Sequence, residues 1–552
     1  MFLAALPLNW GKAYFIFVSF LFPIYFIPVT TDKATGLNHG GIMHRFFIRS
    51  IFLAAFCLTF QAQAQTFTRK PFLQKGAYNK ATVCWRVSAA TALTVKFGTD
   101  STNLANTSAA SANNVDACVT LDSTKLQPNT KYFYDVYNGA TKLAGSAKQY
   151  FITAPVVGAK KKSTFWILGD PGSAGTQQRN VRDGFYRLNN GAPLDGVIMN
   201  GDVAYESGTD AEFTSNLFTP FADAFATAFT WSCIGNHEAV ASTTGASYLA
   251  AFNFPTAGEI GGVASGSELY YSYDYANIHF IILDSQVSSR TKTGAQYLWL
   301  QQDLQATRQD WIVAVWHHPP YSKSGHNSDT EQQLIDMRTN FLPLLEQYAV
   351  DAVYCGHSHD YERTYLLDSA YGLSTDNQAK AARVIMDNKS GNPTTTGPYR
   401  KTAMHGTHSG TVYALVGSSA KLDAGTLHPM VYSQFVNVPG SGILTVEDTV
   451  LTSKFIDSTG TVRDQFQIVK TRGTTGITGR PVLKQDAQKF SQMGRRFVFP
   501  TNNTTPFRIY SLGGNLMSHE IPHGTWEPSP KLLPSGAYYF RYGGRFGKLS
   551  IP

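Results

Sequence analysis

The sequence predicts a multidomain protein in which a central α/β domain follows an N-terminal β-sandwich and precedes a small C-terminal β-sandwich. Its length of 552 residues suits about three or four domains. The sequence pattern changes twice: short alternating strands come first, apolar strands separated by helical stretches follow, and a turn-rich segment ends the chain. The composition, with 43% hydrophobic and 15% charged residues, is that of a globular protein.

An export signal is predicted before Gln65. Met43 is followed by basic residues, by an apolar core from Ile51 to Phe60 and by a small-residue cleavage site. We therefore expect residues 1–42 to be a misassigned upstream extension and residues 43–64 to be a signal peptide. The alternative is a membrane-anchored form, although the apolar stretch ahead of Met43 is short for a span of about 20 residues.

Residues 65–157 predict the N-terminal β-sandwich, because short alternating strands are separated there by turn residues. The segment from Leu126 to Tyr134 resembles part of fibronectin type III domains, and Trp85 stands where such domains keep a core tryptophan. Cys84 and Cys118 lie in this segment and could form a disulfide bond.

Residues 164–470 predict a layered α/β domain, because apolar strands alternate with longer helical patterns. The strand Phe165–Leu168 ends directly at a polar motif, and later strands repeat this arrangement. Apolar residues at helical spacing predict a helix from Tyr297 to Leu304. The late strands Val412–Val416 and Gly442–Val446 are expected in a second sheet.

Residues 471–552 predict the small C-terminal β domain, since turn, basic and aromatic residues become frequent there. From about Pro500 this segment resembles the sorting domain of the type IX secretion system. The resemblance implies contact with secretion machinery, passage across an outer membrane, and a secreted or cell-surface location. The alternative is an extra sandwich that binds carbohydrate or a partner.

Charge and cysteine usage exclude several classes of protein. The net charge is +8 and no basic run is longer than Lys160–Lys162, so no nucleic-acid partner is indicated. None of the five cysteines stands in a C-x-x-C pair, which excludes a zinc ribbon and a thioredoxin-like motif. Cys233 and Cys355 are expected to be buried, unreactive thiols.

Five short polar motifs recur in the central domain, most of them directly after apolar runs. One such motif alone is more often a turn than a site. Their joint presence predicts one site, because open α/β sheets carry their chemistry at the carboxyl ends of strands. The motifs are Gly169-Asp170-Pro171-Gly172, Gly201-Asp202-Val203-Ala204-Tyr205, Gly235-Asn236-His237-Glu238, Trp316-His317-His318-Pro319 and Gly356-His357-Ser358-His359.

These motifs supply the ligands expected of a binuclear metal centre. Mixed oxygen and imidazole donors suit iron, zinc or manganese, whereas calcium prefers oxygen alone. Asp202 is the candidate for a carboxylate that bridges two cations about 3.5–4 Å apart. A phenolate favours a trivalent ion, so Tyr205 indicates ferric iron; the alternative is a ring packed behind the site. The predicted ligands are Asp170, Asp202, Tyr205, Asn236, His317, His357 and His359.

Two further histidines are candidate catalytic residues. His237 follows Asn236 directly, and His326 lies in a polar loop after His317. Histidines beside a metal site can bind phosphate oxygens and protonate a leaving alkoxide. Glu238 could orient one of them, and His318 is expected in the outer shell. The alternative for His326 is a solvated loop residue.

The motifs stand in the order found in purple acid phosphatases, within the binuclear metallophosphoesterases. The resemblance covers about Gln65 to Lys470 and includes Gly-His-x-His-x-Tyr-Glu-Arg, which ends here at Arg363. It implies a fibronectin-type domain followed by a catalytic sandwich of two sheets flanked by helices. It also implies ferric iron on Asp170, Tyr205 and His359, a divalent ion (Fe2+, Zn2+ or Mn2+) on Asn236, His317 and His357, Asp202 as the bridge, and phosphate contacts from His237 and His326.

The predicted function is therefore hydrolysis of small phosphate monoesters by a metal-bound hydroxide, that is, an acid phosphatase. A phosphodiesterase or nucleotide hydrolase on the same metal frame is one alternative. A secreted binding module with a vestigial metal site is the other. The sequence leaves the physiological substrate, the divalent ion, the pH optimum and the oligomeric state open.

Overall fold

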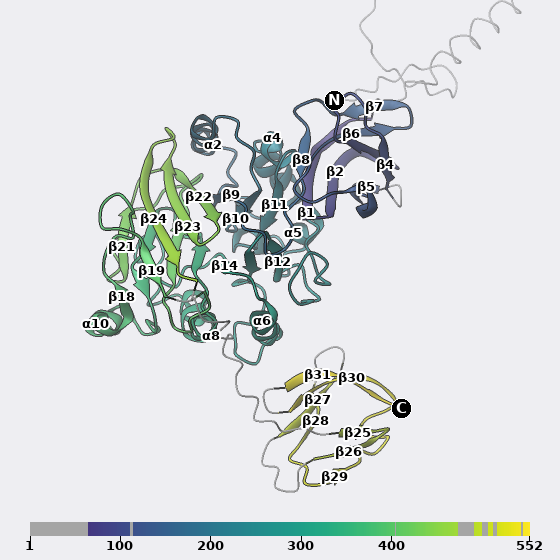
Figure 1. Cartoon of the computed structure of the whole chain (residues 1–552), viewed down its shortest axis with the longest axis vertical. Coiled ribbons are helices and arrows are strands. Elements are labelled where there is room, and N and C mark those ends of the chain that lie inside the picture. Colours follow the sequence, from purple (N-terminus) through teal and green to yellow (C-terminus); the bar gives the residue numbers. More distant parts are fainter. Residues whose placement is uncertain are drawn as a thin grey trace, which may run out of the picture. The chain divides into compact units, whose positions relative to one another are not determined.

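The structure is a computed structural model that describes residues 65–110, 114–402, 404–472, 491–499, 506–511, 516–542 and 545–552 (Figure 1). The predicted upstream extension, residues 1–42, and the predicted signal peptide, residues 43–64, lie outside these ranges. Within these ranges, no helix is both long enough and apolar enough to cross a membrane.

The N-terminal region forms a β-sandwich whose two sheets enclose a buried core that includes Trp85, Tyr134 and Phe151. One half contains the antiparallel strands β1 (Phe67–Ala77), β2 (Lys80–Thr91) and β5 (Asn114–Thr120). The other half contains β3 (Thr94–Gly98), β4 (Asn106–Ala109), β6 (Lys131–Asn138), β7 (Thr141–Ala144) and β8 (Tyr150–Ile152).

Cys84 and Cys118 form a disulfide bond, as the sequence suggested. The two residues are direct partners in the antiparallel pair β2–β5. Cys233 and Cys355 are free and buried, which confirms the other cysteine prediction.

The N-terminal sandwich does not end at a domain boundary, because β1 continues into the central sheet. Leu73 of β1 pairs in parallel with Phe229 of β11 (Phe229–Ser232). Arg69 on β1 also donates to Thr214 and to Asp210 of the central region. The sequence predicted separate sandwiches, and the structure instead has one sheet running through both.

Two sheets form the central region. The ten-stranded sheet has the order β19-β24-β23-β22-β9-β10-β11-β1-β2-β5, and the seven-stranded sheet has the order β12-β13-β14-β15-β20-β16-β21. The further strands of the first are β9 (Ser163–Leu168), β10 (Gly196–Met199), β19 (Tyr399–Lys401), β22 (Gly440–Glu447), β23 (Val450–Asp457) and β24 (Val462–Lys470). Those of the second are β12 (Tyr271–Tyr275), β13 (Ile278–Ile282), β14 (Trp311–Val315), β15 (Ala352–Cys355), β16 (Tyr361–Thr364), β20 (Val412–Val416) and β21 (Val431–Phe435).

The sequence placed both late strands in the second sheet, and this was right for β20 only. The strand β22 joins the first sheet, where Gly442 pairs antiparallel with Ile167 of β9. Both strands are short apolar runs, so their residues are equally suited to either buried sheet. Which sheet edge a returning strand joins depends on tertiary packing.

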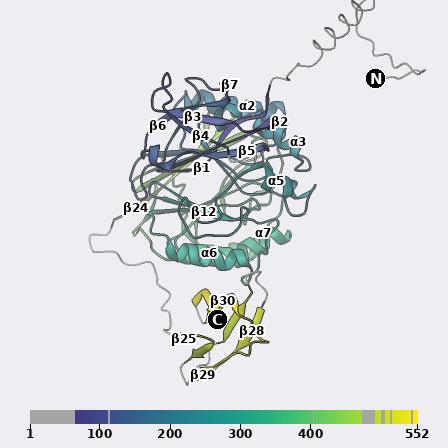
Figure 2. The same ribbon diagram turned by 90° about the vertical axis from the view of Figure 1, so that its right-hand side faces the viewer.

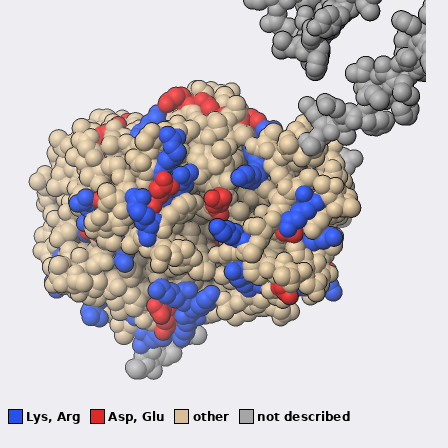
Figure 3. Space-filling view, turned by 90° about the horizontal axis from the view of Figure 1, so that it is seen from above, with Lys and Arg blue, Asp and Glu red and all other residues tan. Residues whose placement is uncertain are grey.

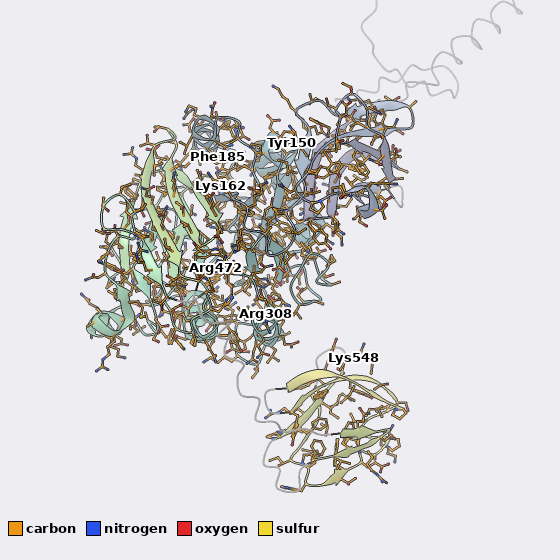
Figure 4. All side chains as sticks on the ribbon, viewed as in Figure 1. Tyr150, Lys162, Phe185, Arg308, Arg472 and Lys548 are labelled. Carbon is orange, nitrogen blue, oxygen red and sulfur yellow. A yellow bond between two sulfur atoms is a disulfide. The ribbon has the colours of Figure 1, made fainter. Side chains whose placement is uncertain are left out.

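The two sheets pack face to face, and helices cover their outer faces (Figure 2). Phe165 faces the second sheet, with its ring centroid 4.7 Å from that of Phe280. Its neighbour Trp166 faces outward and stacks at 4.1 Å on Phe185 of α2 (Thr176–Asn189), which is labelled in Figure 4. On the other side, α6 (Ala295–Ala306) packs on the outer face of the second sheet, which confirms the predicted helix.

Shorter elements connect these layers. They are α3 (Asp210–Glu212), α4 (Ala222–Phe225), α5 (Ala246–Ala251), α7 (Gln332–Asp336), α8 (Leu342–Gln347), α9 (Ser374–Ala379), α10 (Ala381–Val384), β17 (Leu366–Leu367), β18 (Ile385–Asp387), and the single turns η1 (Ser123–Lys125), η2 (Phe213–Phe218), η3 (His237–Ala239) and η4 (Met337–Phe341).

The C-terminal region contains two small sheets around one aromatic core that includes Phe497, Phe499 and Phe507. The strands are β25 (Ser491–Met493), β26 (Arg496–Val498), β27 (Phe507–Tyr510), β28 (Leu516–Glu520), β29 (Thr525–Trp526), β30 (Gly536–Tyr542) and β31 (Arg545–Ile551). The β-rich region expected at this end is therefore present.

Candidate metal centre

The predicted ligands meet because their strands end at the same edge of the sandwich. Asp170, Asp202 and Asn236 follow β9, β10 and β11, which are neighbouring parallel strands. His317 and His357 follow β14 and β15, which are parallel neighbours in the second sheet. Parallel strands place their carboxyl ends at one edge, so the loops from both sheets face one another.

One group of donors surrounds Tyr205. Its hydroxyl lies 3.1 Å from Nε2 of His359 and donates to Oδ1 of Asp170, also at 3.1 Å. One carboxylate oxygen from each of Asp170 and Asp202 and one nitrogen of His359 lie within 4.8 Å of one another. Carboxylate, phenol and imidazole donors thus converge on one point.

A second group surrounds Asn236. Its Oδ1 lies 2.9 Å from Nε2 of His317 and 2.9 Å from Nδ1 of His357. Asp202 connects the two groups, because its Oδ2 lies 3.4 Å from His317 Nε2 while the same side chain belongs to the first group. The residue predicted to be the bridge therefore lies between the two sets of donors.

Burial makes this an environment that favours cations. Burial raises the pKa of Asp170 to about 7, and burial together with nearby carboxylates raises the pKa of Tyr205 well above its usual value. Burial opposes ionisation of Asp202 as well, but His317 holds the pKa of that carboxyl below its usual range. Buried acidic groups need positive charge nearby. The donor set and its burial therefore fit a pair of metal ions.

The second nitrogen of each ligand imidazole is also held. His317 Nδ1 donates to the carbonyl oxygen of Asn200 at 2.8 Å. His359 Nδ1 lies 3.1 Å from a carboxylate oxygen of Asp423, and His357 Nε2 lies 3.3 Å from one of Glu331. Such partners fix the ring orientation and raise the basicity of a metal-binding histidine.

Comparison with known proteins identifies this region. Residues 163–361 match the calcineurin-like phosphoesterase family. They form a calcineurin-like metallophosphoesterase domain. The matched segment contains six of the predicted ligands directly after its strands, together with Tyr205.

The chain is homologous to purple acid phosphatases. It is 41% identical to purple acid phosphatase 23 of Arabidopsis thaliana over 136 residues, which are 23% of this chain and 28% of that protein. It is 30% identical to purple acid phosphatase 21 of Arabidopsis thaliana over 248 residues, 43% of this chain and 51% of that protein. The chain thus spans about half or less of the length of these curated relatives.

A solved structure shows the same fold. The purple acid phosphatase PPD1 from yellow lupin (Lupinus luteus) seeds superimposes with a TM-score of 0.54 at 19% identity. The match covers 74% of this chain and 77% of the lupin chain. The two-sheet sandwich flanked by helices that the sequence implied is therefore confirmed.

The carboxylate of Glu238, in the metallophosphoesterase domain, binds backbone amides rather than a histidine side chain. Its buried carboxylate accepts hydrogen bonds of 2.8–3.0 Å from the amides of Asp202, Val203, Ala204 and Gly235. The sequence suggested that Glu238 orients a catalytic histidine, and these contacts assign it instead to the loop that carries Asp202.

The two candidate catalytic histidines lie on either side of the ligands. His326 stacks on His357 with ring centroids 3.6 Å apart, and its Nδ1 lies 2.9 Å from Oε2 of Glu331. His237 Nδ1 donates to the carbonyl oxygen of Glu206 at 2.6 Å. His237 Nε2 lies 3.9 Å from Oδ2 of Asp202, so this edge of the ring faces the ligands.

His318, which the sequence placed in the outer shell, lies close to two of the candidate ligands. One of its nitrogens lies within 4.8 Å of nitrogens of His317 and His357. Its Nδ1 lies 2.7 Å from the Ser285 hydroxyl, and burial lowers the pKa of His318 well below its usual value. A neutral His318 therefore borders the second group of donors.

Glu331 and Asp423 are site residues that sequence reasoning missed. Asp423 stands 64 positions after His359. Glu331 stands only five positions after His326, so its closeness to His326 in the sequence could have indicated that it belongs to the site. No motif marks Asp423, and only the fold brings it to His359.

Proposed function

We propose that this protein is a phosphatase of the purple acid phosphatase type, which hydrolyses small phosphate monoesters at the centre formed by Asp170, Asp202, Tyr205 and their neighbours. The observation that carries the proposal is the position of Asp202 between two sets of donors, one of which contains a phenol. A phenolate suits ferric iron, and the imidazole-rich set suits a divalent ion.

The residues that would hold the metals follow from these two sets. Ferric iron would be held by Asp170, Tyr205 and His359, with Asp202 shared. The second set, Asn236, His317 and His357, would hold Fe2+, Zn2+ or Mn2+. Two bound cations would supply Lewis acidity, neutralise phosphate charge and lower the pKa of water.

The chain's own residues would bind and orient the substrate. The Nε2 atoms of His237 and His326 would donate to phosphate oxygens, and a protonated His326 would pass its proton to the leaving oxygen. Oε2 of Glu331 lies 2.9 Å from His326 Nδ1 and so orients the ring with Nε2 available to the substrate. The ligand side chains Asp170, Asp202 and His317 are buried, and burial would strengthen their charge interactions with a bound substrate.

The central test is Asp202→Asn. We expect the bound metal to fall below one ion per chain and monoester turnover to fall by more than about 100-fold, because a shared ligand has lost its charge. Metal analysis and hydrolysis of 4-nitrophenyl phosphate measure the two effects. Wild-type protein that binds less than one ion per chain would refute the proposal, and faster turnover of bis(4-nitrophenyl) phosphate would make it a phosphodiesterase.

We also propose that the protein acts outside the cytoplasm. The Cys84–Cys118 disulfide supports this, because such bonds persist in oxidising compartments. Cleavage before Gln65 and sorting of the C-terminal region by a type IX system remain predictions. N-terminal sequencing of secreted protein tests the cleavage: a chain that begins well before Gln65 contradicts it.

A further inference from the structure

Lys421 lies beside the candidate metal centre and is not one of its candidate ligands or catalytic residues. The Nζ atom of Lys421 lies 3.7 Å from the centroid of the Tyr205 ring. The hydroxyl of that ring contacts Asp170 and His359. Lys421 therefore places a positive charge against the ring of a candidate metal ligand, next to the site where phosphate would bind.

The position of Lys421 is set by a loop that is fastened to the site. Two residues further on, the amide of Asp423 donates to the carbonyl oxygen of His359 at 3.0 Å. The amide of Thr426 donates to the carbonyl oxygen of Lys323, also at 3.0 Å, in the loop that carries His326. The lysine thus extends from a loop whose backbone is hydrogen-bonded to the segments that carry His359 and His326.

The partner of Lys421 is a carboxylate at the surface. Both oxygens of Glu206 lie 2.8 Å from Lys421 Nζ. The Glu206 side chain is 68% exposed, and exposed ion pairs contribute little to stability, so this pair can open at small cost. The same carboxylate lies 3.9 Å from Nδ1 of His237, the histidine expected to contact phosphate.

We propose that Lys421 is a specificity-determining residue that binds a second anionic group, a carboxylate or a second phosphate, on the leaving group of the substrate. Glu206 occupies this position when the substrate offers no such group. An incoming anion replaces Glu206, so Lys421 stays paired and no charge is left uncompensated. The inference rests on the proposed phosphomonoesterase function and names its substrate class.

The experiment compares two esters that differ in one charge, 4-carboxyphenyl phosphate and its methyl ester. In the metal-loaded wild type, kcat/KM is expected to be higher for the acid. Lys421→Met is expected to lower the ratio of kcat/KM, acid over methyl ester, by about tenfold, because a charge-assisted contact is lost. Lys421→Arg should restore most of the ratio, and Glu206→Gln should raise it by removing the competing carboxylate.

Lys323→Met is the matched control, because Lys323 lies in the neighbouring loop and pairs with Asp329 at 3.0 Å. We expect this variant to keep the wild-type ratio. Inhibition by 4-carboxybenzylphosphonate and by its methyl ester gives a second readout that needs no turnover of the probe. The difference between the two inhibition constants should shrink in Lys421→Met.

Two results would overturn the inference in different ways. An equal loss of kcat/KM for both esters in Lys421→Met would mean that Lys421 acts on the transferred phosphate or on the fold. Hydrolysis of neither ester by metal-loaded wild-type protein would instead overturn the proposed function, and this inference with it.

Discussion

Tyr205 and His359 are 154 positions apart in the chain, yet the Tyr205 hydroxyl lies 3.1 Å from Nε2 of His359. The contact joins a loop of the first sheet to a loop of the second. A phenol at this place distinguishes the centre from one built of carboxylates and imidazoles alone.

Tyr205→Phe should abolish the visible absorption of the metal-loaded protein, because the variant lacks the phenol oxygen that is proposed to bind ferric iron. The far-ultraviolet circular dichroism should stay unchanged. Tyr273→Phe, which removes another buried hydroxyl between the sheets, is the control and should keep the band. A colourless wild type, or a band that survives in Tyr205→Phe, would contradict the assignment of ferric iron.

Asp423→Asn and Glu331→Gln should weaken different metal positions. Asp423 contacts His359 and Glu331 contacts His357, so each variant perturbs one imidazole. Loss of such a partner lowers metal affinity about 10–100-fold. Metal competition assays should show weaker ferric binding in Asp423→Asn and weaker divalent binding in Glu331→Gln. The same loss of both ions in both variants would argue against two distinct positions.

The stability of the fold should fall at alkaline pH because of His279. Its ring contacts Asp274 at 2.7 Å and Asp303 at 2.8 Å, and although burial opposes protonation, these carboxylates raise the pKa of His279 to about 9. The folded state therefore holds a proton that the unfolded chain, with an ordinary pKa near 6.5, releases earlier. The stabilisation is fully present below pH 6.5 and is lost as the pH rises through about 9.

A shift of this size corresponds to about 3 kcal/mol of unfolding free energy. Urea unfolding of wild type and His279→Gln should differ most at pH 6 and converge towards pH 10. His408→Gln, at an exposed histidine paired with Asp368, is the control. A difference between wild type and His279→Gln that does not depend on pH would show that His279 is not charged in the folded state.

Removal of the Cys84–Cys118 disulfide should destabilise the N-terminal sandwich. The bond closes a loop with a sequence separation of 34, which corresponds to about 2–4 kcal/mol. Thermal unfolding of a double Cys→Ala variant should show a lower Tm than the wild type. Because β1 also belongs to the central sheet, the metal centre should lose stability in the same transition; separate transitions would show that the two regions unfold independently.

The candidate ligands could be found from the sequence because most of them follow a short apolar strand directly. A buried parallel strand ends in a loop at a known edge of the sheet, so the order of motifs along the chain was enough to predict convergence. Glu238 shows the limit of this reasoning. Its place after His237 suggested a contact between side chains, but in the structure its carboxylate accepts hydrogen bonds from the amides of the compact turn that ends at Ala204.

By itself, the sequence determined most of the strands, the helix at Tyr297–Leu304 and the ligand types, because these depend on local periodicity and on chemistry carried by single residues. It offered the Cys84–Cys118 bond only as a possibility, which the structure decided. Only the tertiary structure decided that β1 pairs with β11 and that β22 pairs with β9. It also decided that Lys421 lies beside Tyr205 and that Asp423 lies beside His359. Pairing between distant segments is selected by the packing of whole layers. No local pattern encodes that choice.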